Sequence, residues 1–178
     1  MRGSLDVAVT LLPAITAAVF AWDAFRLRAR PAGLALATLL TTAAIWTGGY
    51  AGEILASSLE GKLLWAKMQY FGIATLPLAW LAFADGYTGG RWRWEHRWPL
   101  LAPFPFVILV LVWTNELHGM IWRSVSIEQV GGLSVLALEH GPAFLAHVAF
   151  AYVLMAAGSI RIVRELWQRP YFGRQAAA

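Results

Sequence analysis

The sequence predicts an all-α membrane protein. We expect a bundle of five transmembrane helices, with the amino end outside, the carboxyl end in the cytoplasm, and a short extracytoplasmic β-hairpin between helices four and five. Three observations lead to this fold class. The chain is too apolar for a soluble domain, five apolar segments have the length of a bilayer span, and basic residues gather in alternate connections.

The composition indicates a chain that is solvated largely by lipid. Of the 178 residues, 59% are hydrophobic and only 13% are charged, about half of the ~25% that is usual in soluble domains. So few polar residues would not cover the surface of a soluble domain, whereas a bilayer can face the apolar sides of helices. The sequence has no cysteine, which excludes disulfides, thiolate metal sites and cysteine nucleophiles.

Five apolar segments are each close to the ~20 residues that cross a bilayer as a helix. None of them alternates between polar and apolar residues as membrane strands do. The first segment ends in an arginine cluster and not in a small-residue cleavage site, so we expect it to be retained. The expected helices cover residues 5–25, 32–52, 63–84, 98–115 and 141–163 of a single domain over residues 1–178.

The connections predict the orientation. Ten of the fourteen basic residues fall in three segments, which follow helices one, three and five. Positive residues stay on the cytoplasmic side of a membrane, so we expect a multi-pass protein of the cytoplasmic (inner) membrane. Because topology explains the net charge of +4, no nucleic-acid partner is expected. The ten are Arg26, Arg28, Arg30, Arg91, Arg93, Arg97, Arg161, Arg164, Arg169 and Arg174.

The connection over residues 116–140 is the only long one. Its first half, from Ser124 to Val130, alternates polar and apolar residues with a period of two. Gly131 and Gly132 follow and are a tight-turn signal, because glycine tolerates positive φ. The pattern predicts a short β-hairpin lying outside over the bundle, and the alternative is an irregular loop.

Two ionisable residues near the expected outer ends of helices two and three are candidates for function. Trp46 and Glu53 share one face of helix two, and Lys67 and Tyr70 share one face of helix three. Charged groups inside a membrane segment are costly to bury and tend to face the bundle or a cavity. Either Glu53 and Lys67 form an ion pair, or both reach the interface and are partly solvated.

A second group of candidates follows helix four. Asn115, His118 and Trp122 are expected at the outer surface, where they could line a pocket that the hairpin closes. Pro77 should kink helix three by removing a backbone donor, which either shapes packing or provides a hinge for signal relay.

No motif in the sequence indicates catalysis, a metal or a cofactor. A GxSxG elbow, an HExxH pair and a phosphate-binding glycine loop are all missing. The four histidines show no i, i+4 pairing that would suggest metal ligation. We therefore expect a chain that is not itself an enzyme and that has no metal and no cofactor.

Several short segments, in order, match a pattern seen in a family of bacterial receptors. They are Ala44-Ile45-Trp46, Glu53, Lys67-x-Gln69-Tyr70, Leu76-Pro77 and Thr114-Asn115-x-x-His118-x-x-x-Trp122. In these segments the chain resembles the N-terminal seven-transmembrane sensory (input) domain of bacterial histidine kinases, of which it would supply the first five helices.

The resemblance implies the sensory module of a two-component system, a receptor whose kinase chemistry would lie in cytoplasmic domains that this chain lacks. The expected partners are membrane lipid and an unknown small-molecule or lipophilic signal, with a homodimer as an option. Two alternatives are a small transporter or ion carrier, since Glu53 and Lys67 could serve an ion path, and a membrane assembly subunit. The candidate ligand-binding residues are Trp46, Glu53, Lys67, Tyr70, Asn115, His118 and Trp122, with Pro77 as the candidate hinge.

Overall fold

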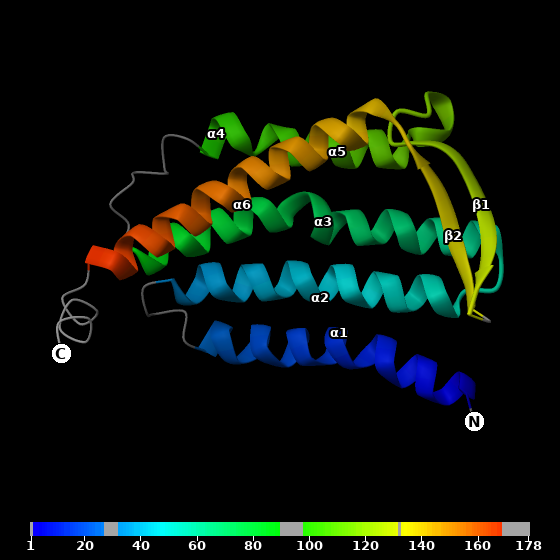
Figure 1. Cartoon of the computed structure of the whole chain (residues 1–178), viewed down its shortest axis with the longest axis horizontal. Helices are drawn as coiled ribbons and strands as arrows, with labels where there is room; N and C mark the ends of the chain where they lie inside the picture. The colour runs from blue at the N-terminus through cyan, green and yellow to red at the C-terminus, as the bar shows by residue number, and fades with distance from the viewer. Residues whose placement is uncertain (1, 27–31, 90–97, 132, 169–178) are drawn as a thin grey trace.

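The structure is a computed structural model that describes residues 2–26, 32–89, 98–131 and 133–168, with side chains from residue 12 of the first range and residue 100 of the third. It is mostly helical, with one two-stranded sheet (Figure 1). The elements are α1 (Arg2–Arg26), α2 (Gly33–Leu55), α3 (Leu59–Tyr87), α4 (Trp98–Leu101), α5 (Pro103–Trp113), the 3-10 turn η2 (Asn115–Leu117), β1 (Trp122–Val130), β2 (Leu133–His140) and α6 (Pro142–Gln168).

All five segments that the sequence predicts as helices are helical, but they differ in their capacity to cross a membrane. Among the described residues, two helices, α2 and α6, are both long and apolar enough to span a bilayer. Helix α5 is apolar but shorter. The number of five spans and the orientation therefore stay predictions. Most arginines on which the orientation rests lie outside the described residues, namely Arg28, Arg30, Arg91, Arg93, Arg97, Arg169 and Arg174.

The predicted fourth helix is wrong as a single element. It is divided at Ala102 into the one-turn helix α4 and the longer helix α5, which ends at Trp113. Pro103 and Pro105 lack the backbone N–H groups that a continuous helix would direct to the carbonyls four residues earlier. The same residues suit the first turn of a new helix, where those donors would have no intrahelical partner.

Helices α2 and α3 pack against each other through glycines. A Cβ atom on Gly49 would lie 2.6 Å from Cγ of Gln69, and one on Gly72 would collide with the backbone of Thr42 and Trp46. Only glycine allows backbones to approach this closely. The two helices are joined by a short turn, in which the Ser58 side chain caps α3 by accepting a hydrogen bond from the Gly61 N–H at 3.0 Å.

The predicted β-hairpin is confirmed. Strands β1 and β2 pair antiparallel around a turn at Gly131, whose φ is +61°. The apolar pairs Val125–Leu138 and Ile127–Leu136 share one face, and Val125, Leu136 and Leu138 pack against the buried core. The hairpin crosses the ends of α2 and α3, as Figure 1 shows.

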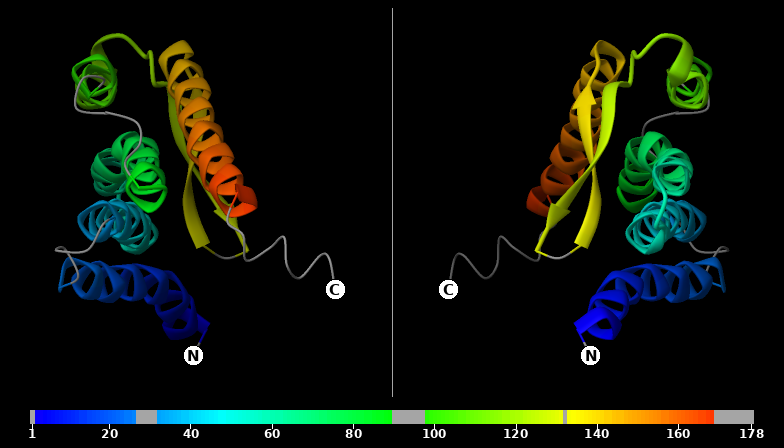
Figure 2. Two further views of the ribbon diagram at one scale, coloured as in Figure 1. Left: turned by 90° about the vertical axis from the view of Figure 1, so that its left-hand side faces the viewer. Right: turned by 90° about the vertical axis from the view of Figure 1, so that its right-hand side faces the viewer.

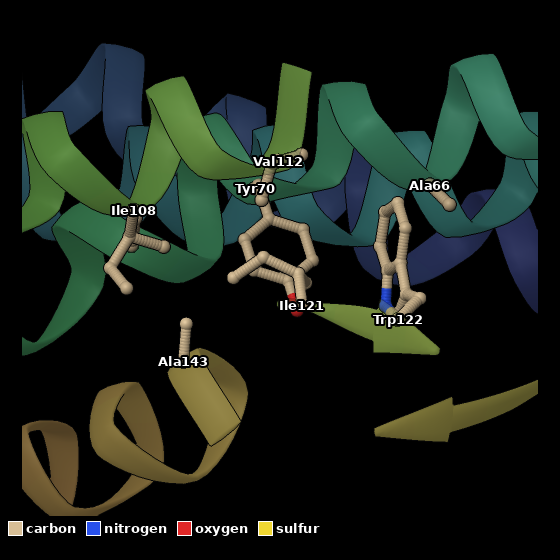
Figure 3. Packing of buried hydrophobic residues seen from close by; sticks show 8 residues of the cluster. Ala66, Tyr70, Ile108, Val112, Ile121, Trp122 and Ala143 are labelled. Atoms are coloured by element: carbon tan, nitrogen blue, oxygen red, sulfur yellow. The ribbon is translucent and has the colours of Figure 1, made fainter. Parts of the chain in front are cut away.

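The core lies where α3, α5, α6 and β1 meet. Figure 2 shows α1, α2 and α3 side by side, with α6 leaning against α3 from the side on which the hairpin lies. The main cluster of buried residues joins all four elements under the hairpin (Figure 3), and a smaller one, Leu78, Leu81 and Leu154, joins α3 to α6 further along. The main cluster contains Ala66, Tyr70, Ala74, Ile108, Val112, Ile121, Trp122 and Ala143.

Candidate ligand site beside the hairpin

Asn115 shapes the loop that leads from α5 to β1. Its side-chain Oδ1 accepts hydrogen bonds from the backbone N–H groups of Ile121 (2.9 Å) and Trp122 (3.0 Å), and its Nδ2 donates to the Trp122 carbonyl (2.9 Å). The side chain is buried, and its three bonds are all made to the chain six and seven residues further on. Asn115 therefore positions the loop, and its polar atoms are already occupied.

His118 is held at both ring nitrogens. Nδ1 accepts a hydrogen bond from the Met120 N–H at 3.0 Å, so it carries no proton in this arrangement. Nε2 lies 3.1 Å from Oγ1 of Thr114, which donates its own proton to the Val110 carbonyl at 2.7 Å. Nε2 must then be the donor, and the local bonds define one neutral tautomer. His118 is an exposed residue, so a ring whose orientation is fixed by hydrogen bonds is also accessible to a ligand.

Tyr70 and Trp122 form a buried aromatic pair in the core next to the loop. Their rings meet edge to face with centroids 5.5 Å apart, and the residues are 4% and 3% exposed. Figure 3 shows the two rings side by side within the core cluster. The ring of His147 on α6 lies 6.3 Å from that of Tyr70, and in the described part of the chain its Nδ1 has no hydrogen-bond partner.

The predicted Glu53–Lys67 ion pair is wrong, because each side chain has a different partner. Nζ of Lys67 lies 2.6 Å from Oε1 of Glu116 in η2, while Glu53 accepts a hydrogen bond from Nε2 of Gln69 at 2.6 Å. Lys67 and Gln69 are two positions apart, about 200° around a helix. When Gln69 faces α2, Lys67 must point away from α2, towards the end of α5.

The Lys67–Glu116 pair lies at the edge of the candidate site. The Lys67 side chain is largely buried and that of Glu116 is half exposed. The hydrogen bond from Lys67 holds the pKa of the Glu116 carboxyl below its ordinary value. Lys67 Nζ also lies 5.8 Å from the ring centroid of Trp113, within the range of a cation–π interaction.

Lys62 is the residue that sequence reasoning missed. It is not among the candidate residues that the sequence offered, yet it is completely buried. Its Nζ donates to the carbonyls of Glu53 (2.7 Å), Ile54 (3.4 Å) and Ser134 (2.6 Å). The first two carbonyls end α2, where the helix dipole favours a cation, and the third lies in β2. Lys62 therefore links the hairpin to the helices through hydrogen bonds. The sequence signal for this role is weak, because it consists only of a lysine one turn after a helix break.

A groove of about 400 Å³ opens between η2 and the start of β1. Of the predicted site residues, Asn115, His118 and Trp122 line it, and Lys67 reaches its rim through Glu116. Trp46, Glu53 and Tyr70 do not line it, and Trp46 is exposed on the side of α2. The lining residues are Leu63, Asn115, Glu116, Leu117, His118, Gly119, Trp122, Arg123, Ser124 and Val125.

Two further predictions concern metal ligands and Pro77. Within the described ranges, no three or more histidine or acidic side chains come close enough together to hold a metal ion. Pro77 is buried, and α3 continues through it without a break in the helix. Its role in packing or as a hinge stays a prediction.

Two apolar helices are long enough to cross a bilayer, and a β-hairpin covers one end of the helix bundle (Figure 1). These features define the class of the protein as a membrane protein. The family described as the N-terminal 7TM region of histidine kinase matches residues 7–178, and the chain belongs to this family. No curated protein and no solved structure shows significant similarity to the chain.

Proposed function

We propose that this chain is the membrane-embedded sensory module of a two-component histidine kinase. It detects an extracytoplasmic or membrane-borne signal in the groove beside the hairpin and relays it to cytoplasmic output domains, which carry the kinase chemistry. In this proposal the amino end and the hairpin lie outside and the carboxyl end of α6 lies inside. Family membership and the groove support it.

One observation carries the proposal: the loop that forms the groove is bonded directly to the start of α6. The Gly141 N–H donates to the Ile121 carbonyl at 2.8 Å, and the Ala143 N–H donates to the Met120 carbonyl at 2.9 Å. Both acceptors lie between His118 and Trp122, which line the groove. A ligand that shifts this loop must also shift the first turn of α6.

The groove can accept a small molecule of mixed polarity. Leu63, Leu117 and Val125 offer apolar contacts, while Arg123 and His118 offer polar ones. Such a mixture is typical of ligand sites, in which a few polar groups fix orientation. The ligand must favour one loop arrangement over another, because equal affinity for both would shift nothing.

Contacts along α6 supply a route from the groove towards the opposite end. The Nε1–H of Trp80 on α3 donates to the Met155 carbonyl on α6 at 3.0 Å, and a Cβ on Gly158 would lie 2.6 Å from the same nitrogen. Movement of α6 along α3 must therefore rearrange the contact at Trp80. Trp80 follows Pro77 in α3. The proposed route therefore runs along two helices, α3 and α6, that pack against each other.

The absence of cysteine from this sequence allows a direct test. In the full-length kinase, with any other cysteines replaced, Ser124→Cys places a thiol in the groove, and Ser126→Cys places one outside it on the same exposed strand. Each variant is treated with a bulky, membrane-impermeant maleimide, and autophosphorylation is measured in membranes. Labelling at position 124 should change autophosphorylation, whereas labelling at position 126 should not. Equal responses at the two positions, or none at position 124, would refute the proposal.

A further inference from the structure

A second groove, separate from the proposed signal site, lies between α1 and α2. It has a volume of about 720 Å³ and is open along one side. Its lining combines small residues, such as Ala18 and the buried Ala37, with the large exposed side chains of Trp22, Leu34 and Ile45. The lining residues are Ala18, Ala21, Trp22, Phe25, Leu34, Ala37, Thr38, Thr41, Thr42, Ala44 and Ile45.

The three threonines of this groove do not make it polar. Each hydroxyl donates to a carbonyl of its own helix: Thr38 to Leu34 at 3.0 Å, Thr41 to Ala37 at 2.8 Å, and Thr42 to Leu39 at 2.8 Å. With their donors used within α2, these side chains add methyl groups to the surface. The groove therefore suits a chain of methylene groups, which needs contact but no hydrogen bonds.

A cation lies at one end of the groove. The guanidinium carbon of Arg26, the last residue of α1, lies 5.5 Å from the ring centroid of Trp22, a wall residue. In the sequence, Arg28 and Arg30 follow within four positions of Arg26, and Asp23 is the one acidic residue among the neighbouring positions of the chain. An apolar groove with Arg26 at one end complements a molecule with an anionic head and an apolar tail.

We propose that the α1–α2 groove binds one acyl chain of an anionic phospholipid and that Arg26 contacts its phosphate. Arginine pairs with phosphate through charge-assisted hydrogen bonds, and basic residues next to membrane helices attract anionic lipid headgroups. In this proposal Trp22, beside Arg26, is at the level of the headgroups, where aromatic residues are enriched in membrane proteins. The proposal rests on the groove and its charge, and it is independent of the sensory function proposed above.

The acyl-chain contact is tested by filling the groove. The purified chain is delipidated in mild detergent, mixed with phosphatidylglycerol or with phosphatidylcholine of the same acyl chains, and examined by native mass spectrometry. Ala18→Trp fills the groove, whereas Val19→Trp adds similar bulk to an exposed position of α1 outside it. We expect Ala18→Trp to lose most of the bound phosphatidylglycerol and Val19→Trp to keep it. Equal binding by the two variants would overturn the proposal.

The headgroup contact is tested by removing one charge. Arg26→Gln should lower the affinity for phosphatidylglycerol about fivefold, the contribution of one basic residue at a bilayer surface. Phosphatidylcholine binding should fall less, because its choline ammonium offsets the charge of its phosphate, so the preference for phosphatidylglycerol should shrink. Arg164→Gln removes the same charge from an exposed position of α6 and should change neither. Both sites are at the surface, so folding should be intact, which circular dichroism checks. The proposal is wrong if the wild-type chain does not prefer phosphatidylglycerol, or if Arg26→Gln keeps that preference.

Discussion

A buried cation usually lies beside a carboxylate, but Lys62 lies among three carbonyl oxygens. Its three ammonium protons match the three acceptors on α2 and β2, which leaves none unsatisfied. The arrangement uses the negative end of a helix in place of an acidic side chain. At the scale of single residues, this is the contact that fixes the turn end of the hairpin to the bundle.

Replacing Lys62 with Met should destabilise the protein. The apolar chain stays similar in length, but the carbonyls of Glu53, Ile54 and Ser134 lose their donor, at a cost of about 1–3 kcal/mol. Thermal unfolding in detergent, followed by circular dichroism, measures the effect. Lys67→Met is the matched control, because its partner Glu116 is half exposed and such pairs contribute about 0–1 kcal/mol. Equal midpoints for the two variants would show that Lys62 is not a structural fastener.

The Lys67–Glu116 pair predicts a dependence of stability on pH. Because Lys67 lowers the pKa of the Glu116 carboxyl in the folded state, the pair contributes stability that is complete above the ordinary value of about 4.5. The contribution is lost as the pH falls through the lower folded-state pKa. Unfolding midpoints of the wild type and Glu116→Gln should therefore differ most near neutral pH and converge in acid. A difference that stays constant down to acidic pH would contradict this account.

These residue-scale contacts could not be predicted from the sequence. Spacing predicts which residues share one face of a helix, but not which neighbour each face meets. For Glu53 and Lys67 the sequence left an ion pair and partial solvation at the interface as alternatives. In the structure Glu53 is hydrogen-bonded to Gln69, and Lys67 is paired with Glu116. Asn115 was expected in the site and does line the groove, but its atoms are bound to the backbone. Such partners depend on packing between elements and not on local sequence.

At the scale of elements, local chemistry made most of the structure predictable. Alternating residues before two glycines predicted the hairpin, because strand faces and tight turns are both set within a few residues. The break at Ala102 was missed although its cause, Pro103 and Pro105, is also local. The hydrophobicity of the segment predicted one continuous helix. In the structure α4 and α5 are separate helices, because the prolines lack the backbone N–H groups that a continuous helix requires.

The close packing of α2 against α3 predicts opposite effects for two similar substitutions. Gly72→Ala places a Cβ against the backbone of Thr42 and Trp46, which cannot move aside easily, and should destabilise the protein by about 1–3 kcal/mol. Gly48→Ala meets only Ala14, at an ordinary 3.8 Å. It should be neutral or stabilise the helix by up to about 1 kcal/mol. Thermal unfolding of both variants measures the difference. If Gly72→Ala matched Gly48→Ala, the helices would not be as close as described.

At the scale of the whole molecule, the fold places the groove and the far end of α6 at opposite ends of one continuous route. The loop after α5 is bonded to the first turn of α6, and α6 then lies along α3 as far as Trp80. The sequence predicted the helices and the hairpin that form this route. It could not predict that the loop before β1 is hydrogen-bonded to the start of α6, because both bonds join backbone groups that any residues would supply.

This route predicts that the contact between Trp80 and α6 controls coupling and not ligand access. Trp80→Phe removes the hydrogen bond to the Met155 carbonyl and keeps most of the ring. In the full-length kinase that carries Ser124→Cys, it should change the response to maleimide labelling by about 0.5–2 kcal/mol of coupling free energy, as changes between coupled sites typically do. The rate of labelling at position 124 should stay the same, because the groove is distant along α6.

Trp167→Phe, at a position of α6 that is 85% exposed, is the control and should leave both quantities unchanged. A Trp80→Phe kinase with normal coupling would show that the signal leaves the groove by another path.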